Sequence, residues 1–545
     1  MPIHAFVLIT FLASASLLAQ SRSERDYWRE TQLNFDVALN GEITDQNCYR
    51  HERLFRGCLF GLHAGLTVLP TYRSSGILPG ERGVLPGFVG VASQGLAYRE
   101  QAIAAWRATT PPQRRAAFDA ALAALKRAHI AESLSWSAAR SLNGFLSIAV
   151  DPHTSISPLA VREERARPSQ VQGLYGLNFV GVTIDGQEAL AINAIDPASP
   201  SHGLLRIGDV IRKVEGRAGE PQELFEALIT RQAARVEVEN IDGLREVDMR
   251  RGPITSSNVE AKSLTHAGLT VAHVSMGTFL PANTCEDTVN KIAAQLNAGA
   301  RALVLDLRAN GGGRTEQAIC LISQFLENGS YVWRDFGVRS GRGDQVRRNP
   351  RGRRLFQDVP TVVLIDGNSA SASEQTSIYL QAYRKAIVVG ETSFGKGTMQ
   401  EVGPYPRNNQ VSMSLTVAMF YGPNGVSPQL IGVTPDFEVF PTVGQSEPTP
   451  VLREGDLFPD AISNDVTPPR DQVREARNQR LQECLERTDG VAAVMEGLNA
   501  YEARVHDLQL ATARALLKCH QDERMEWPRD INIPSVPMPG PMRDR

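Results

Sequence analysis

Residues 366–374 read DGNSASASE and place serines at alternate positions, Ser369, Ser371 and Ser373. The preceding TVVLID has the continuous apolar character of a buried strand, and the residues that follow have a helical pattern. A strand, a tight turn and a helix can present a side chain beside the free N–H groups and positive dipole of the helix N-terminus. A serine there could attack a carbonyl group and have its oxyanion stabilised by those amides. The competing interpretation is that the serines only cap the helix.

A lysine stands in a glycine-flanked segment that follows the next apolar run. In GETSFGKGTMQ, Lys396 lies between Gly395 and Gly397, so the backbone can approach another element closely while the lysine points inward. With an ordinary pKa of about 10.4, only about one lysine in a thousand is neutral near pH 7. An apolar pocket that lowers this pKa would make Lys396 a general base, as in Ser–Lys variants of the catalytic triad. The alternative is a solvated lysine at a strand end.

A glycine-rich turn supplies a third component. VLDLRANGGGRTEQA ends an apolar run in Gly311, Gly312 and Gly313 just before a helical pattern, and such a backbone can offer N–H groups to a developing negative charge. A phosphate-binding loop is disfavoured, because the G-x-x-x-x-G-K-[ST] pattern and the acidic residue of a dinucleotide site are both missing.

The elements that must position these residues differ along the chain. Residues from about 34 to 166 are mostly helical in pattern, and 175–250 alternate as short strands with one short helix. Beyond about residue 259, continuous apolar runs alternate with helical stretches, which predicts buried parallel strands with crossover helices. A proline-rich linker at about 441–470 leads to a predicted pair of helices, and the final IPSVPMPGPMRDR is predicted to be disordered.

Taken together, DLRANGGG, GNSASASE and GETSFGKGTMQ resemble, in the same order, the motifs of the carboxyl-terminal-processing, or tail-specific, serine proteases. GFLSIAVDPHTS upstream and LIGVTPDFEV downstream are similar to further motifs of that family. The β module resembles a PDZ domain through YGLNFVGV and IDPASPSHGLLRIGDVIRKVEG. The resemblance covers roughly Asn143 to Val439 and implies an α/β, crotonase-like protease core.

The resemblance also implies roles for individual residues. It makes Ser371 the nucleophile, because the family's lysine follows the middle serine by 25 positions, and Lys396 stands at that spacing. Gln400 would hold the lysine, and Glu374 would support the site. The remaining two serines are left to capping and packing. The amides expected to form the oxyanion hole are those of Gly312 and Ala372.

Recognition of a substrate tail is the second implication. A PDZ groove adds a peptide as an extra strand and captures its carboxylate on loop amides, here expected at Gly176, Leu177, Asn178 and Phe179, with the two apolar side chains shaping the pocket. The expected partners are polypeptides with free, apolar C-termini. Ala382 stands where many family members have an acidic residue, which predicts slower or differently regulated turnover.

These inferences give a multidomain α+β fold with an N-terminal helical region, a PDZ-like β module, an α/β core and a C-terminal helical extension. The terminal helices are the candidate surfaces for a homo-oligomer or an adaptor. The expected boundaries are 1–20 for a signal peptide, 21–168 for the helical region, 169–255 for the PDZ domain, 256–440 for the core and 441–545 for the linker, extension and tail.

The N-terminus and composition indicate where the protein acts. An apolar run from Ala5 to Ala19 precedes strongly charged sequence, as in a secretory signal peptide. Export, most simply to a bacterial periplasm, follows, with no stable membrane anchor after signal removal. A formal net charge of −3, from 57 basic and 60 acidic residues, argues against nucleic acid as a partner.

Six cysteines in an exported chain permit disulfide bonds. Two pairs are predicted, one within the first 60 residues and one between the two C-terminal helices, and the remaining two cysteines are predicted to be buried free thiols. The predicted pairs are Cys48 with Cys58 and Cys484 with Cys519, and the predicted thiols are Cys285 and Cys320. No cysteine has the C-x-x-C spacing of a zinc site.

Several rival interpretations are weaker. SFGK satisfies the S-x-x-K motif of β-lactamases, but its glycines disfavour the required helix. Asp151 and His153 of DPHT could bind a metal, yet a turn locked by Pro152 explains them, so neither a metal nor a cofactor is expected. The arginine-rich stretch at 339–354 is predicted to be a solvated hairpin. The runner-up function is a catalytically inactive, PDZ-bearing peptide-binding or scaffold protein.

Overall fold

The computed structural model describes the chain in several stretches. These are residues 43–66 except 44 and 51, 110–123 except 114, 117 and 121, 135–160, 175–251 except 185–186 and 196–198, 257–338, 343–350, 354–441, 451–457 except 452, 461–462, 470–525 and 527. The signal peptide predicted at 1–20 and the disordered tail predicted at 533–545 lie outside the described residues. None of the described helices is long and apolar enough to span a membrane.

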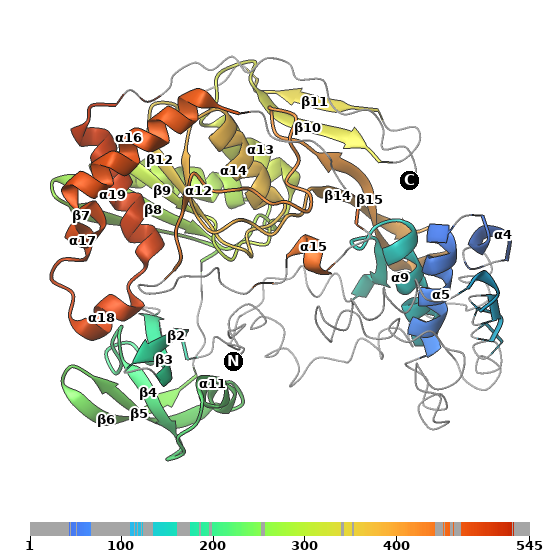
Figure 1. Cartoon of the computed structure of the whole chain (residues 1–545), viewed down its shortest axis with the longest axis horizontal. Coiled ribbons are helices and arrows are strands. Elements are labelled where there is room, and N and C mark those ends of the chain that lie inside the picture. The colour runs from blue at the N-terminus through green and yellow to red at the C-terminus, as the bar shows by residue number, and fades with distance from the viewer. Residues whose placement is uncertain are drawn as a thin grey trace.

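A six-stranded sheet forms the centre of the α/β core (Figure 1). Its neighbouring strands run parallel, except for the antiparallel pair at one edge. The two central strands are buried at every position, which explains why their sequences are continuously apolar. In spatial order the strands are β16 (Phe437–Glu438), β13 (Ile387–Gly390), β12 (Thr361–Ile365), β9 (Ala302–Asp306), β8 (Leu269–Met276) and β7 (Val259–His266).

Helices cover both faces of this sheet (Figure 1). Alternate residues of β12 point to opposite faces, so Val363 packs with the helices of one layer and Leu364 with those of the other. The first layer holds α12 (Thr284–Asn297), α13 (Thr315–Ser323) and α14 (Ala372–Ala382). The second layer holds α16 (Gln472–Thr488) and α19 (Leu508–Asp522). The predicted α/β core is therefore confirmed.

A second, antiparallel sheet joins the N-terminal region to this core. Its longest strand, β15, pairs with β14, β10 and the early strand β1. Strand β10 also pairs with β11, which lies within the arginine-rich stretch and is exposed throughout. Strand β1 lies inside the region predicted at 21–168 and pairs with β15 of the region predicted at 256–440, so these two regions share one sheet. The strands are β1 (Ser155–Pro158), β10 (Tyr331–Gly337), β11 (Gln345–Arg348), β14 (Thr398–Tyr405) and β15 (Asn408–Phe420).

N-terminal helices pack beside this second sheet. Gly61 of α5 lies so close to α9 that an added Cβ would stand 2.5 Å from the Ser141 carbonyl oxygen, which explains a glycine within a helix. The buried side chains of both helices share a cluster with Ile156 of β1 and Val411 of β15. The helices are α4 (Asp45–Cys48), α5 (Glu52–Leu66) and α9 (Ser135–Ala149).

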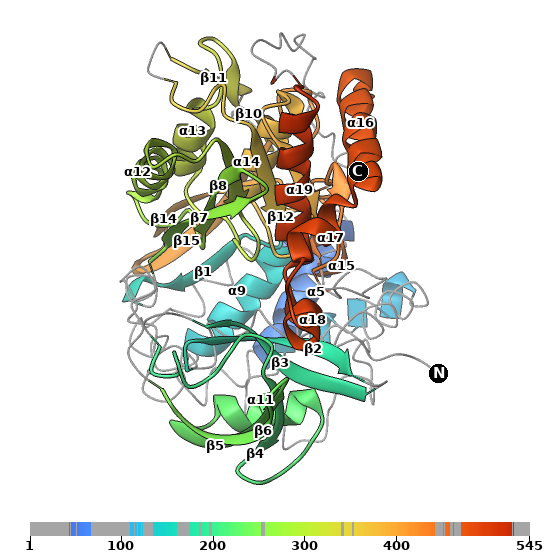
Figure 2. The ribbon, with the colours of Figure 1, turned by 90° about the vertical axis from the view of Figure 1, so that its left-hand side faces the viewer.

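A separate β module lies beside the core (Figure 2). Its five antiparallel strands follow one another in chain order, which leaves β2 and β6 at the edges. One face packs on α11 through Leu224, Phe225 and Leu228, as expected for a mostly-β unit with one short helix. The elements are β2 (Leu177–Ile184), β3 (Gln187–Ile195), β4 (Val210–Val214), α11 (Pro221–Ile229), β5 (Ala233–Asn240) and β6 (Gly243–Arg250).

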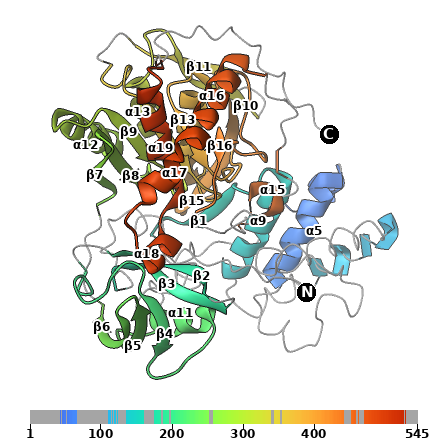
Figure 3. The ribbon, with the colours of Figure 1, turned by 60° about the vertical axis from the view of Figure 1, so that its left-hand side comes forward.

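The C-terminal extension differs from the predicted helical pair, because the stretch from 470 to 525 contains four helices. Asp489, Asn499 and Asp507 stand at N-caps and divide the segment. Figures 2 and 3 show α18 beside β2 and β3, where Tyr501 packs on Ala189, Ala191 and Val210, and its hydroxyl donates to Glu239 Oε1 at 3.0 Å. The added helices are α17 (Gly490–Met495) and α18 (Ala500–Val505), and α15 (Glu454–Leu457) lies in the predicted linker.

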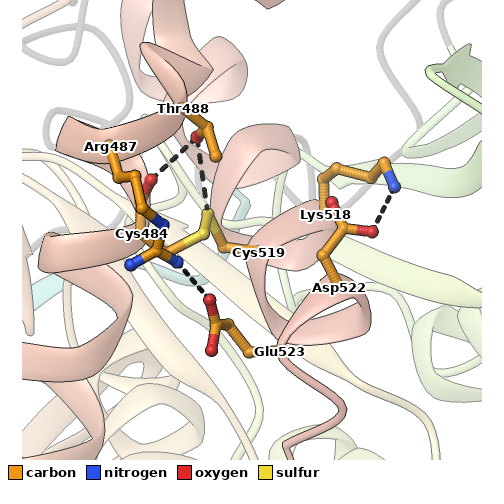
Figure 4. The surroundings of a disulfide bond; sticks show 7 residues. All are labelled: Cys484, Arg487, Thr488, Lys518, Cys519, Asp522 and Glu523. Carbon is orange, nitrogen blue, oxygen red and sulfur yellow. Dashed lines mark hydrogen bonds and ion pairs between the residues drawn. A yellow bond between two sulfur atoms is a disulfide. The ribbon is translucent and has the colours of Figure 1, made fainter.

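All six cysteines form disulfide bonds, so one prediction was wrong. The bonds Cys48–Cys58 and Cys484–Cys519 are present as predicted, and Figure 4 shows the latter joining α16 to α19. Cys285 and Cys320, predicted to be free thiols, are bonded to each other with their Cα atoms 6.1 Å apart. The reason is that α12 and α13 lie in the same layer, a packing that the sequence pattern does not reveal.

The Cys285–Cys320 disulfide bond can be tested by counting free thiols. Protein prepared in an oxidising compartment and alkylated under denaturing, non-reducing conditions should carry no alkyl group by intact mass, and six after reduction. Two alkyl groups on Cys285 and Cys320 before reduction would instead show that these residues are free.

The same bond should stabilise the core. Replacing Cys285 and Cys320 together by serine should lower the free energy of unfolding by about 2–4 kcal/mol in denaturant titrations, because the open chain gains entropy when unfolded. The matched control is the double serine variant of Cys484 and Cys519, whose bond spans the same 35 residues. Stability equal to the unmodified protein would contradict the assignment.

Candidate active site

Three loops meet at one edge of the central sheet because β13, β12 and β9 are parallel neighbours. The glycine turn at 311–313 follows β9, the serine turn at 366–371 follows β12, and the lysine segment at 391–397 follows β13. Since the carboxyl ends of parallel strands lie at the same edge, these three sequence motifs become adjacent. Topology alone therefore brings together the residues singled out in the sequence.

Ser371 occupies a strained turn. It is the N-cap residue of α14 and has φ of 55° and ψ of −111°, a conformation that costs a non-glycine residue about 1–3 kcal/mol. Two hydrogen bonds hold the turn, from Ser371 N to Glu374 Oε2 at 2.8 Å and from Ala370 N to the Asn310 carbonyl oxygen at 3.0 Å. This backbone projects a partly exposed serine at the beginning of a buried helix.

The two flanking serines are buried and tie the serine turn to the glycine loop. Ser369 Oγ donates to the Leu307 carbonyl oxygen at 2.9 Å, and Ser373 Oγ donates to that of Asn310 at 2.8 Å. Neither is the N-cap of α14, so their role is packing and the holding of the turn, while Ser371 itself stands at the cap position.

Glu374 joins the serine turn to the lysine segment. Its fully buried carboxylate accepts four hydrogen bonds, from Ser393 Oγ at 2.6 Å, Gly395 N at 2.7 Å, and Ser371 N and Lys396 N at 2.8 Å each. Burial raises the pKa of Glu374 to about 7, and the four hydrogen bonds oppose that rise. Because all four partners donate, the arrangement is that of an ionised carboxylate.

The amino group of Lys396 is held by two acceptors. Its Nζ donates to the Thr398 carbonyl oxygen at 3.0 Å and to Gln400 Oε1 at 2.7 Å. Burial lowers the pKa of Lys396, and the negative charges of Glu454, Asp151 and Glu374 oppose this. Within the described residues no hydrogen bond joins Ser371 Oγ to Lys396 Nζ.

Gly312 lies against the serine. With φ of 95°, an added Cβ would stand 2.8 Å from Ser371 Cβ and 2.9 Å from Ala372 N, so no other residue fits. Its N–H donates to Asn310 Oδ1 at 2.9 Å and is therefore engaged in this conformation. Ala372 is the first residue of α14, so its N–H belongs to the turn that has no helical acceptor.

Sequence reasoning missed residues that surround the lysine. Asp151, interpreted as part of a turn, accepts from Thr416 Oγ1 at 2.8 Å, and His153 Nε2 lies 2.9 Å from both carboxylate oxygens of Glu454. Glu454 comes from the predicted linker, and its N–H donates to the Phe394 carbonyl oxygen. The DPHT motif was the available signal for the first two residues, whereas nothing in the linker marked Glu454.

Metal binding gains no support from this cluster. The DPHT segment is a turn, closed by a hydrogen bond from Thr154 N to the Asp151 carbonyl oxygen at 2.9 Å. Among the described residues, no group of three or more His, Cys, Asp or Glu side chains is arranged to hold a metal ion.

The predicted tail-binding residues lie in the β module. Gly176, with φ of 65°, ends a tight turn that leads into the edge strand β2. The Phe179 side chain is buried and contacts Phe225 of α11 edge-on, with ring centroids 6.0 Å apart, so it lies in the module's core. Leu177 is only partly buried at the start of the strand.

Comparison with known proteins identifies the family. Residues 270–439 match the model of peptidase family S41. The chain is 30% identical over 315 residues to a carboxy-terminal-processing protease of Bartonella bacilliformis, covering 55% of this chain and 68% of that relative. It is 28% identical over 329 residues to the tail-specific protease of Haemophilus influenzae, covering 55% of this chain but only 45% of that relative.

Solved structures give a weaker likeness. One is a photosystem II D1 C-terminal processing protease, with a TM-score of 0.35 and 22% identity, covering 58% of this chain and 86% of that one. The matched domain and the sequence relatives together show that the chain belongs to peptidase family S41 and is a serine-type peptidase related to the carboxy-terminal-processing proteases.

Proposed function

We propose that the chain is an endopeptidase in which Ser371 is the nucleophile and Lys396 the general base, and that it cleaves exported polypeptides near their C-termini. The observation that carries this proposal is the double attachment of Glu374, whose Oε2 accepts from the backbone N–H of both residues at 2.8 Å. One buried carboxylate thereby fixes the two proposed reactive residues relative to each other.

The proposed mechanism follows from the lysine's hydrogen bonds. A neutral amine has two N–H groups and one lone pair, and Thr398 and Gln400 accept from Nζ. The lone pair then takes the Ser371 hydroxyl proton as Oγ attacks the scissile carbonyl carbon, and the Ala372 and Gly312 amides stabilise the oxyanion. Lys396 passes the proton to the leaving amine as the C–N bond breaks. Water then hydrolyses the acyl-enzyme by the same route.

In this mechanism the described conformation is a resting one. The Gly312 N–H is donated to Asn310 Oδ1, and Lys396 does not contact the Ser371 hydroxyl through a hydrogen bond in the described part of the chain. Substrate binding would turn the Gly312 amide toward the oxyanion. Labelling of Ser371 by a fluorophosphonate probe tests whether the serine is reactive, and absence of labelling would contradict its proposed role as nucleophile.

We also propose that the β module is a PDZ domain that reads the free tail of the substrate. Support comes from its edge strand β2, which is flanked by α11 and opens with the turn at Tyr175 and Gly176. An extended peptide can add to such an edge, with its carboxylate at the turn. The proposed location is the bacterial periplasm, and the terminal helices remain the proposed surfaces for an adaptor or a second copy.

The proposed dyad predicts loss of activity on either change. Lys396→Ala should lower kcat/KM for peptide cleavage by at least about a thousandfold, as should Ser371→Ala, because both belong to one catalytic unit. Lys396→Arg should fail equally, since a guanidinium group does not lose its proton. Lys262→Arg, at an exposed position of β7, is the matched control. An active Lys396→Arg variant would remove the lysine from the mechanism.

The pH dependence has a definite sign. Because burial lowers the pKa of Lys396 from 10.5, its neutral form becomes populated at a lower pH than that of an exposed lysine. The value of kcat/KM should therefore be small in acid and rise with pH through that pKa, with folding monitored in parallel by circular dichroism. An optimum at about pH 5 would point to a carboxylate base instead.

Tail recognition is tested by the chemistry of the substrate's end. Amidating the C-terminus of a peptide with an apolar tail should sharply lower kcat/KM, because the turn amides lose their carboxylate. Leu177→Ala should weaken the preference for apolar tails. Leu244→Ala, exposed on the opposite edge strand β6, should leave it unchanged. Equal cleavage of free-acid and amidated peptides by the unmodified protein would exclude tail reading.

A further inference from the structure

A chain of hydrogen bonds leads from the lysine to a buried carboxylate. Lys396 Nζ donates to Gln400 Oε1 at 2.7 Å, Gln400 Nε2 donates to Thr416 Oγ1 at 3.0 Å, and Thr416 Oγ1 donates to Asp151 Oδ1 at 2.8 Å. Asp151 and Thr416 are fully buried. Neither residue was singled out as functional by its motif.

We infer that Asp151 and Thr416 are positioning residues. They fix the donor-to-acceptor direction of these hydrogen bonds, so that Gln400 presents its oxygen to Lys396. The inference rests on the proposed role of Lys396 and goes beyond it. Asp151 stands in the turn between α9 and β1, outside the matched peptidase segment at 270–439.

The carboxylate of Asp151 sets the donor-to-acceptor direction of these hydrogen bonds. An ionised Asp151 can only accept, and Oδ1 already accepts from His153 N at 3.0 Å, so Thr416 must use its single hydroxyl hydrogen toward Asp151. The Thr416 oxygen is then free to accept from Gln400, whose second amide hydrogen goes to Thr398 Oγ1 at 3.0 Å. Both amide hydrogens are used, and Gln400 Oε1 is the atom left for the lysine.

Reversing the amide would place its NH₂ group against the lysine. A charged Lys396 would then face a second donor in a buried site, and a neutral Lys396 would lose the acceptor that orients its N–H groups. The lone pair of a neutral Lys396 would accept from this NH₂ group and would not be available to the Ser371 hydroxyl. The acceptor-only carboxylate thus controls the geometry of a base with which it shares no hydrogen bond.

Charge gives Asp151 a second effect on the lysine. Three carboxylates act on Lys396, those of Glu454, Asp151 and Glu374, and each raises its pKa against the lowering effect of burial. Within the described residues Asp151 Oδ2 has no hydrogen-bond partner, so part of this charge is not compensated locally. Thr416, in contrast, is uncharged and acts through orientation alone.

The hydroxyl is tested first. Thr416→Val should lower kcat about 10- to 100-fold with KM little changed, and Thr416→Ser should restore kcat because it retains the hydroxyl. Thr288→Val is the matched control, since Thr288 is equally buried and its hydroxyl donates to a carbonyl of its own helix. Wild-type kcat in a folded Thr416→Val variant would overturn the inference.

The carboxylate is tested by its pH effect. Asp151→Asn keeps the size of the side chain but can donate, so it should lower kcat as Thr416→Val does. It should also move the acid limb of kcat/KM to lower pH, because removing a negative charge lowers the pKa of Lys396. Thr416→Val retains that charge, so its acid limb should stay at the wild-type position.

A purely structural role for Asp151 would lower the amount of folded protein without moving the acid limb, and that result would overturn the inference. The outcomes also separate this inference from the proposed function. Full activity of Lys396→Ala would remove the general base itself. An inactive Lys396→Ala variant beside a fully active Thr416→Val variant would leave the dyad intact and exclude only the positioning role.

Discussion

The site depends on the burial of one carboxylate among donors from two loops. Glu374 receives backbone N–H groups from the serine turn and the lysine segment, together with the Ser393 hydroxyl. These bonds offset the cost of the positive φ angle at Ser371. If this carboxylate were absent, four donors would be left buried without an acceptor, and the two loops would have no common anchor.

Around that anchor, the site is assembled from distant parts of the chain. Parallel strand order makes the glycine, serine and lysine loops neighbours, while β15 supplies Thr416. The turn before β1 brings Asp151 to Thr416 across 265 residues, and the predicted linker brings Glu454 to His153 across 301. Two of the three carboxylates that act on Lys396, those of Asp151 and Glu454, consequently come from segments outside the matched peptidase region.

The sequence predicted the α/β core and the three loops because continuous apolar runs and glycine-rich turns are local features. The predictions from the sequence failed where a contact between separate elements determines the structure. Cys285 and Cys320 were predicted to be separate buried thiols, but they form a disulfide bond because α12 and α13 lie in the same layer. Glu454 was predicted to lie in a linker, whereas in the structure its N–H donates a hydrogen bond to the Phe394 carbonyl oxygen. The spacing of residues in the sequence also could not reveal that the Gly312 N–H donates a hydrogen bond to Asn310 Oδ1 in this conformation.

The contact of α18 with the β module has a mechanical consequence. Tyr501 seals the face of the module opposite α11, and α18 is followed directly by α19, which packs on the central sheet and is bonded to α16 through Cys484–Cys519. The polypeptide connects the module to β1 on one side and to β7 on the other, and the contact with α18 is a third attachment. Any rotation of the module away from α18 would expose the apolar contacts of Tyr501 to water, so these contacts oppose such a rotation.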